Sequence, residues 1–167
     1  HALWEGGRLM RCVTSLGHYT LHVILAYGFT KAGLCAEQRA LNEPLLSEAV
    51  GLAAKLGKAP CIVTGDLNTT IEASSTLNQA TRLGHLVDVA RCTGRDLEPT
   101  CFPRGSSVGT RIDHILANST ASSMLRSFAV LQGTGIPTHR PLQVELEHGL
   151  VEQQGMSFRA PTELPLN

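Results

Sequence analysis

The strongest chemical signal in the chain is a carboxylate and an amide placed two residues apart, directly after a short apolar run. Asp66 and Asn68 follow Pro60-Cys61-Ile62-Val63, which is typical of a buried strand that ends in a tight turn at Gly65. At a strand end both side chains can reach one crevice, where Asp66 could hold a hard cation or orient a water and Asn68 could bind a phosphate. An ordinary turn after a strand has the same composition, so this segment alone leaves both interpretations open.

Two later segments supply a second carboxylate and a histidine. Arg111-Ile112-Asp113-His114-Ile115-Leu116 alternates like a half-buried strand, and Pro137-Thr138-His139-Arg140-Pro141 places His139 just ahead of another alternating strand, Leu142 to Leu146. A carboxylate beside a histidine fixes the imidazole tautomer and stabilises the imidazolium cation. We therefore expect Asp113 and His139 to act together.

These segments resemble those of the endonuclease/exonuclease/phosphatase superfamily, the deoxyribonuclease-I-like proteins that include abasic-site endonucleases and retrotransposon endonuclease domains. The resemblance is carried by Gly65-Asp66-Leu67-Asn68, Arg111-Ile112-Asp113-His114-Ile115 and Pro137-Thr138-His139-Arg140-Pro141, with weaker matches at Ile24-Leu25-Ala26-Tyr27-Gly28 and Thr100-Cys101-Phe102. It extends over residues 8–148.

The resemblance implies an α/β fold, a four-layer α/β/β/α sandwich that is incomplete at its amino-terminal side. The family's first strands, with an Asn and the main metal-binding Glu, have no counterpart ahead of Arg8, and Glu5 lies in no matching motif. Residues 1–148 are expected to form the carboxy-terminal part of such a domain. Residues 149–167, which are polar and contain two prolines, are expected to be a disordered tail or linker.

The implied chemistry is phosphodiester hydrolysis by in-line attack of water, assisted by Mg²⁺ or Mn²⁺, with DNA as the expected substrate. By resemblance, Asp66 orients or deprotonates the water, Asn68 holds water or phosphate, and His139 stabilises the phosphoryl charge while Asp113 fixes its ring. The implied site residues are, for catalysis, Asp66, Asn68, Asp113, His139 and Tyr27; for the metal, Asp66 and Asn68; and for substrate binding, Arg104, Arg111, Arg140 and Thr138. Thr138 stands where the family has an Asp, and a neutral hydroxyl cannot replace its charge.

Composition limits the other possibilities. With 167 residues and 43% hydrophobic content, the chain can bury a single core. Lys plus Arg equals Asp plus Glu at 14 each, so attraction to nucleic acid requires a local basic patch, for which Arg104, Arg111 and Arg140 are candidates. No apolar stretch is long enough to span a membrane, no signal peptide is recognisable, and nothing points to an obligate protein partner.

The five cysteines are widely spaced and odd in number, which predicts reduced, mostly buried thiols of an intracellular protein. A nuclear location is left open and secretion is not expected. No Cys-x-x-Cys pair is present along the chain, and the sequence does not predict a structural zinc site.

Periodicity and turn residues predict the elements that position these side chains. An amphipathic helix is expected from Ala36 to Leu56, with Pro44 either kinking or dividing it. A second helix is expected from Ser75 to Leu83, capped by Thr69 or Thr70. The remaining expectations are a hairpin of Leu9–Ser15 with Tyr19–Tyr27, a short helix capped by Asn118, and a strand at Ser127–Leu131.

Three functions remain compatible with the sequence. The first is a nuclease domain, such as that of a retroelement; the second is a phosphatase or lipid phosphodiesterase of the same superfamily. The third is a degenerate, non-catalytic remnant or binding module that keeps the fold but lacks the family's Glu. Because the metal site is incomplete in the sequence, catalytic competence of the chain itself is left open.

Overall fold

The computed structural model describes residues 6–147. Glu5 and the expected tail at residues 149–167 lie outside the described residues. The larger sheet has five strands in the order β1-β2-β3-β5-β4. They are β1 (Leu9–Leu16), β2 (Tyr19–Ala26), β3 (Cys61–Asp66), β4 (Val87–Asp88) and β5 (Asp113–Ala117). A second sheet pairs β6 (Leu125–Val130) with β7 (Leu142–Leu146).

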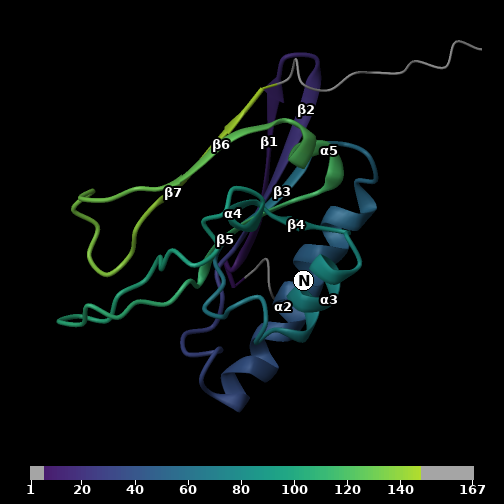
Figure 1. Cartoon of the computed structure of the whole chain (residues 1–167). Coiled ribbons are helices and arrows are strands. Elements are labelled where there is room, and N and C mark those ends of the chain that lie inside the picture. Colours follow the sequence, from purple (N-terminus) through teal and green to yellow (C-terminus); the bar gives the residue numbers. More distant parts are fainter. Residues whose placement is uncertain (1–5, 148–167) are drawn as a thin grey trace, which may run out of the picture.

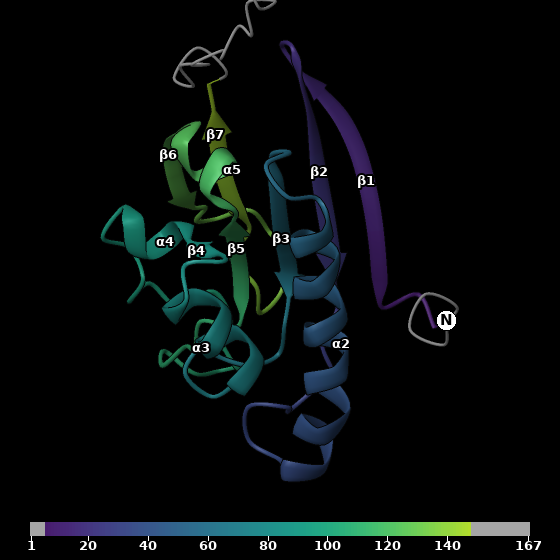
Figure 2. The same ribbon diagram turned by 90° about the vertical axis from the view of Figure 1, so that its right-hand side faces the viewer.

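The two longest helices and the small sheet lie on opposite sides of the five-stranded sheet (Figures 1 and 2). The main helices are α2 (Ala36–Lys55) and α3 (Ser75–Arg82), and shorter ones are α4 (Val89–Cys92) and α5 (Ser119–Ser123). One core cluster joins Ile24 and Val63 to residues of α2 and α3. A second joins Ile62 and Ile115 to residues of β6 and β7. Side chains alternate between the two faces along each strand, so the strands contribute residues to both core clusters. The chain has the α/β fold that the sequence predicts.

The crossover through α2 places the Asp66 turn at the carboxyl-terminal end of β3, as expected. Strand β2 runs parallel to β3, so α2 must carry the chain back across the sheet before β3 begins. The helix is continuous through Pro44, which is exposed. Strand β5 then returns antiparallel to β3, which brings the end of β3 beside the start of β5.

Several local predictions are confirmed and two are wrong. The hairpin of β1 and β2 forms, and Asn118 caps α5 by accepting a hydrogen bond from the Ala121 N–H at 3.0 Å. The cap of α3 is Ser74, which lies directly before the helix, and not Thr69 or Thr70. The cysteines are all free, but only Cys61 is buried, since the others lie on the edge strand β1, in a short helix or in loops.

None of the helices in residues 6–147 combines the length and the apolar character needed to cross a bilayer.

Candidate active site

Strand register brings two carboxylates face to face. In the antiparallel pairing of β3 and β5, Asp66 lies directly opposite Asp113. Directly opposed residues of such a pair project on the same side of the sheet. Here that side is the one shared with Ile62 and Ile115, which packs against the small sheet. The site therefore lies at the end of the strands, where the two sheets meet.

Close backbone packing holds Asp66 in place. Gly65 has φ 139°, and an added Cβ would collide with the carbonyl oxygen of Ala26 at the end of β2. Behind it, the buried side chain of Asn42 on α2 connects the two loops that follow β2 and β3. Its Oδ1 accepts from the Phe29 N–H at 2.9 Å and its Nδ2 donates to the Leu67 carbonyl at 3.0 Å. The turn carrying Asp66 is thus fixed on both sides.

His139 enters the site from a strained turn. Its N–H donates to the Pro137 carbonyl at 2.8 Å, which closes a three-residue turn around Thr138, whose φ is 65°. A positive φ is unfavourable for a β-branched residue, and such strain persists only where the surroundings impose it. The surroundings here are backbone bonds to the segment before β5: the Phe102 N–H donates to the Thr138 carbonyl and the Arg140 N–H to the Thr100 carbonyl, both at 2.7 Å.

Asp113 orients the imidazole of His139. The Nδ1 of His139 lies 3.0 Å from Oδ2 and 3.3 Å from Oδ1 of Asp113. The hydroxyl of the fully buried Thr100 donates to the same Oδ2 at 2.7 Å and accepts the N–H of Asp113 at 3.1 Å. With its proton held at Nδ1 by the carboxylate, neutral His139 presents an unprotonated Nε2 away from Asp113.

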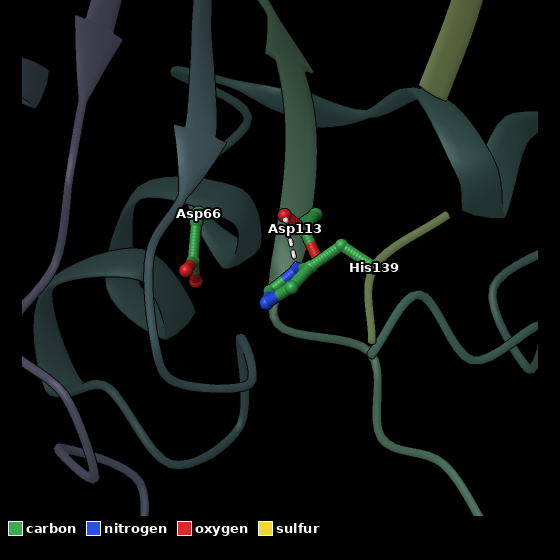
Figure 3. Close-up of side chains that lie close together, drawn as sticks. All are labelled: Asp66, Asp113 and His139. Atoms are coloured by element: carbon green, nitrogen blue, oxygen red, sulfur yellow. Dashed lines mark hydrogen bonds and ion pairs between the residues drawn. The ribbon is translucent and has the colours of Figure 1, made fainter. Parts of the chain in front are cut away.

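The three titratable groups converge on one space. Figure 3 shows the side chains of Asp66 and Asp113 at the ends of neighbouring strands, with the ring of His139 beside them. They line an open pocket of about 250 Å³, together with Arg140 and Leu142. Burial raises the pKa of the Asp66 carboxyl, and the charge of Asp113 adds to the rise, whereas the Asn68 N–H and His139 oppose it. The site thus contains a carboxylate with increased proton affinity beside an oriented imidazole.

Two of the expected catalytic residues lie next to this group rather than within it. The Asn68 N–H donates to Asp66 Oδ1 at 3.0 Å, while its side-chain amide donates to the Gly28 carbonyl at 3.3 Å. Asn68 also lines a neighbouring hollow of about 320 Å³ with Lys31. Tyr27, directly after β2, is half exposed, and the guanidinium of Arg8 lies 5.3 Å from its ring centre. Within residues 6–147, no hydrogen bond joins Tyr27 to the three converging groups, and Tyr27 does not line their pocket.

The four expected substrate-binding residues separate into different environments. Arg140 lines the pocket, and its guanidinium stacks 4.0 Å from the ring centre of Phe102. Arg104 and Thr138 are exposed, Thr138 directly before His139 and Arg104 in the loop before β5. Arg111 is instead largely buried in an ion pair with Asp88. Its guanidinium donates hydrogen bonds to both carboxylate oxygens, at 2.6 and 3.1 Å, so the structure contradicts its expected role in substrate binding.

The donor atoms suit a small divalent cation. A carboxylate oxygen of Asp66, one of Asp113 and a ring nitrogen of His139 lie within 4.8 Å of one another. Magnesium is commonly held by one or two carboxylates, with water and substrate phosphate completing its shell. Asp66 is the more available carboxylate, because Asp113 already accepts from Thr100 and His139. The residues present therefore fit a metal that is shared with a bound phosphate.

Comparison with known proteins shows to which family the chain belongs. Residues 15–133 match the model of the Endonuclease/Exonuclease/phosphatase family. The chain belongs to this family. The match includes Asp66 and Asp113 and ends before His139. A search of curated protein sequences finds no match.

Several solved structures share the fold. A 3′ phosphatase, NExo, from Neisseria, bound to product DNA hairpin, aligns with a TM-score of 0.64 at 19% identity over 87% of this chain and 68% of its own. The catalytic domain of Xenopus laevis APE2 gives 0.64 at 20% identity over 83% and 54% of the two chains. An AP endonuclease from Archaeoglobus fulgidus gives 0.59 at 18% identity over 83% and 65%. The chain thus spans about one half to two thirds of the length of these enzymes.

Sequence reasoning missed two residues that touch the site. The Thr100 hydroxyl donates a hydrogen bond to the Asp113 carboxylate, and the Cys101 sulfur lies 3.6 Å from His139 Nε2. The only signal was the weak resemblance of Thr100-Cys101-Phe102 to a family strand, which here forms isolated bridges at Cys101 to Thr110 and His139.

Proposed function

We propose that the chain carries the water-activating and phosphate-binding groups of a divalent-metal-dependent phosphodiester hydrolase that acts on DNA. The observation that supports this most directly is the convergence of Asp66, Asp113 and His139 on one pocket, with the imidazole held by Asp113. A DNA substrate is further supported by the printed descriptions of the similar structures, which include a phosphatase bound to a DNA hairpin and AP endonucleases.

Asp66 is the group that would accept the proton of the attacking water. Its pKa is raised by burial, which makes the carboxylate a stronger base than an exposed one. The water oxygen forms a bond to phosphorus as the bond to the leaving oxygen breaks. The leaving oxygen departs with that electron pair and is protonated from solvent.

His139 would stabilise the charge on the phosphoryl oxygens. Nδ1 is held by Asp113, so a proton on Nε2 can be directed at the phosphate, and the carboxylate offsets the positive charge of the ring. Arg140 lies on the same pocket wall and would add a fixed positive charge. Asn68, whose N–H already binds Asp66, would orient the carboxylate or the phosphate, and Tyr27, Arg104 and Thr138 would lie along the path of the substrate.

A magnesium or manganese ion held by Asp66, with Asn68 or Asp113 beside it, would supply charge neutralisation at the phosphate. The chain's own residues account for the remaining roles: a base for water, an oriented cation and a pocket open to solvent.

The test is cleavage by the protein in its full reading frame. We expect nicking of abasic or supercoiled plasmid DNA in the presence of magnesium, and a loss of about 10²–10⁴-fold in kcat for Asp66→Asn and for His139→Ala. Matched controls are Asp96→Asn, a half-buried carboxylate in an ion pair with Arg91, and His18→Ala in the hairpin turn. Unchanged rates in the first two variants would rule out the proposed roles.

The same experiment separates the other functions. Release of phosphate from a 3′-phosphorylated strand, or from inositol or sphingolipid substrates, without DNA nicking would identify a phosphatase or lipid phosphodiesterase. Thr138, which stands where the superfamily carries an Asp, is the observation that favours a non-catalytic remnant. DNA binding without turnover, unaffected by Asp66→Asn, would support that third function.

A further inference from the structure

Arg140 is a cation with a defined orientation beside the active site. It lines the pocket on which the two carboxylates and the imidazole converge. Its guanidinium stacks 4.0 Å from the ring centre of Phe102, and within residues 6–147 it forms no ion pair with a carboxylate. Stacking uses the face of the guanidinium, so the N–H groups along its edge can still donate hydrogen bonds to a ligand.

Backbone pairing places Phe102 beside Arg140. The Phe102 N–H donates to the Thr138 carbonyl and the Arg140 N–H to the Thr100 carbonyl, both at 2.7 Å. In this antiparallel pairing Phe102 and Arg140 are diagonal neighbours, which project on the same side and lie within reach of aromatic and long side chains. The stack therefore follows from the register of the two segments.

Gly109 holds the ring from the loop before β5. An added Cβ at Gly109 would lie 2.7 Å from Cε1 of Phe102 and 2.8 Å from the Cys101 carbonyl oxygen, so the glycine backbone packs directly on the ring. Cys101 and Thr110 exchange two backbone hydrogen bonds, at 2.8 and 2.9 Å, which keep Gly109 in this place. The ring is thus fixed by backbone contacts that do not involve Arg140.

We propose that Phe102 positions the guanidinium of Arg140 to bind two oxygens of one phosphate of the DNA strand. Phe102 is a positioning residue, and Arg140 is the residue that contacts the substrate and selects it. This inference deepens the proposed function and rests on it for the DNA ligand.

An oriented guanidinium binds phosphate in a way that a mobile cation does not. Its planar fork matches two phosphate oxygens, and a side chain that is already ordered loses less conformational entropy on binding. Lysine at the same position would supply the charge without the fork or the planar stack. Because the formal net charge of the chain is zero, its affinity for DNA must depend on individual, well-placed cations.

The test is DNA binding by the protein in its full reading frame, with calcium in place of magnesium and a gel to confirm that the DNA stays intact. Fluorescence anisotropy of a labelled duplex gives Kd at several salt concentrations. Arg140→Met should weaken binding and reduce the slope of log affinity against log salt by about 0.9, the value for one lost phosphate contact. Arg140→Lys should keep most of that slope and still bind more weakly than the parent.

A double-mutant cycle tests whether Phe102 acts through Arg140. Phe102→Leu should raise Kd by roughly 3–30-fold, the range that cation–π interactions span. In the Arg140→Met background the same substitution should have little effect, because residues that act through one contact are not additive. Phe102→Tyr keeps an aromatic face and should bind like the parent. The matched control is Phe128→Leu, the same change in the buried core at β6, which should leave Kd unchanged.

The stack can also be observed without DNA. The ring current of Phe102 should shift the Nε–H proton resonance of Arg140 upfield in the NMR spectrum of the free parent protein, a measurement that requires no Phe102 variant to fold. An Arg140 resonance at its usual position, an unchanged salt slope in Arg140→Met, or equal losses from Phe102→Leu with and without Arg140→Met would each overturn the proposal. Cleavage without this coupling would refute the inference alone, and coupled binding without cleavage would refute only the hydrolase. A parent that binds no DNA would overturn both.

Discussion

The buried ion pair of Asp88 and Arg111 allows a quantitative test of what the arginine before Asp113 does. The side chains are 2% and 11% exposed, and the shorter of their two contacts is 2.6 Å. Removing one partner of such a pair leaves the other as an uncompensated buried charge, at a cost of about 3–5 kcal/mol. Asp88 also accepts the Ala90 N–H at the start of α4, at 3.3 Å. Each single substitution should therefore be costly.

We expect Arg111→Met to lower the free energy of unfolding by about 3–5 kcal/mol, and Asp88→Asn by an amount near the lower limit because an amide can still accept one hydrogen bond. For a domain of this size the corresponding fall in Tm is about 10 °C. The double variant removes both charges, so its loss should be well below the sum of the single losses.

The assay is urea unfolding monitored by circular dichroism. KM for DNA is measured under conditions in which each variant is folded. Arg104→Met is the matched control, since Arg104 lies exposed in the loop before β5 and should leave stability unchanged. If Arg111→Met were as stable as the parent but bound DNA more weakly, then the arginine would be a phosphate ligand, as the sequence predicts, and the structural assignment would be wrong.

Three further predictions concern the backbone, the imidazole and a buried histidine. Gly65→Ala should cost about 3 kcal/mol or more, from the collision with β2 and the unfavourable φ; Gly51→Ala in open space on α2 should gain up to about 1 kcal/mol, and urea unfolding compares them. Asp113→Asn should lower kcat by about 10²-fold or more with little change in KM. Burial lowers the pKa of His114 from 6.5, so the unfolded chain takes up its proton first as pH falls. Stability should then decline below about pH 6.5, by up to about 1.4 kcal/mol per pH unit, and the decline should be weaker in His114→Phe.

Strand patterns in the sequence identified three side chains that the structure brings together. Asp66 follows an apolar run, Asp113 lies in an alternating segment and His139 comes just ahead of another strand, which is how these three residues could be found from sequence. The fold class and the family are confirmed. The relation of Asp66 to Asp113 depends on the register in which β3 and β5 pair.

What the sequence could not predict is which side chains meet across different elements. Arg111 and Asp88 are 23 residues apart, and Cys101 and His139 are 38 apart. Nothing in the local pattern around Arg111 distinguishes a buried ion-pair arginine from one that faces solvent. The same holds for Asn42, a polar residue on a helix face, whose burial depends on two loops that happen to need a donor and an acceptor.

The position of His139 shows how the fold and the chemistry depend on each other. No strand carries this residue; it is held by the strained turn at Thr138 and by backbone bonds to the Thr100-Cys101-Phe102 segment. That segment also supplies the hydroxyl on Asp113 and the sulfur near Nε2. A change that loosens this segment should therefore disturb the carboxylate, the imidazole and the thiol together. Thr100→Val, which removes only the hydroxyl, should affect Asp113 first, and its effect on kcat would measure how much of the imidazole's orientation originates outside the Asp113–His139 pair.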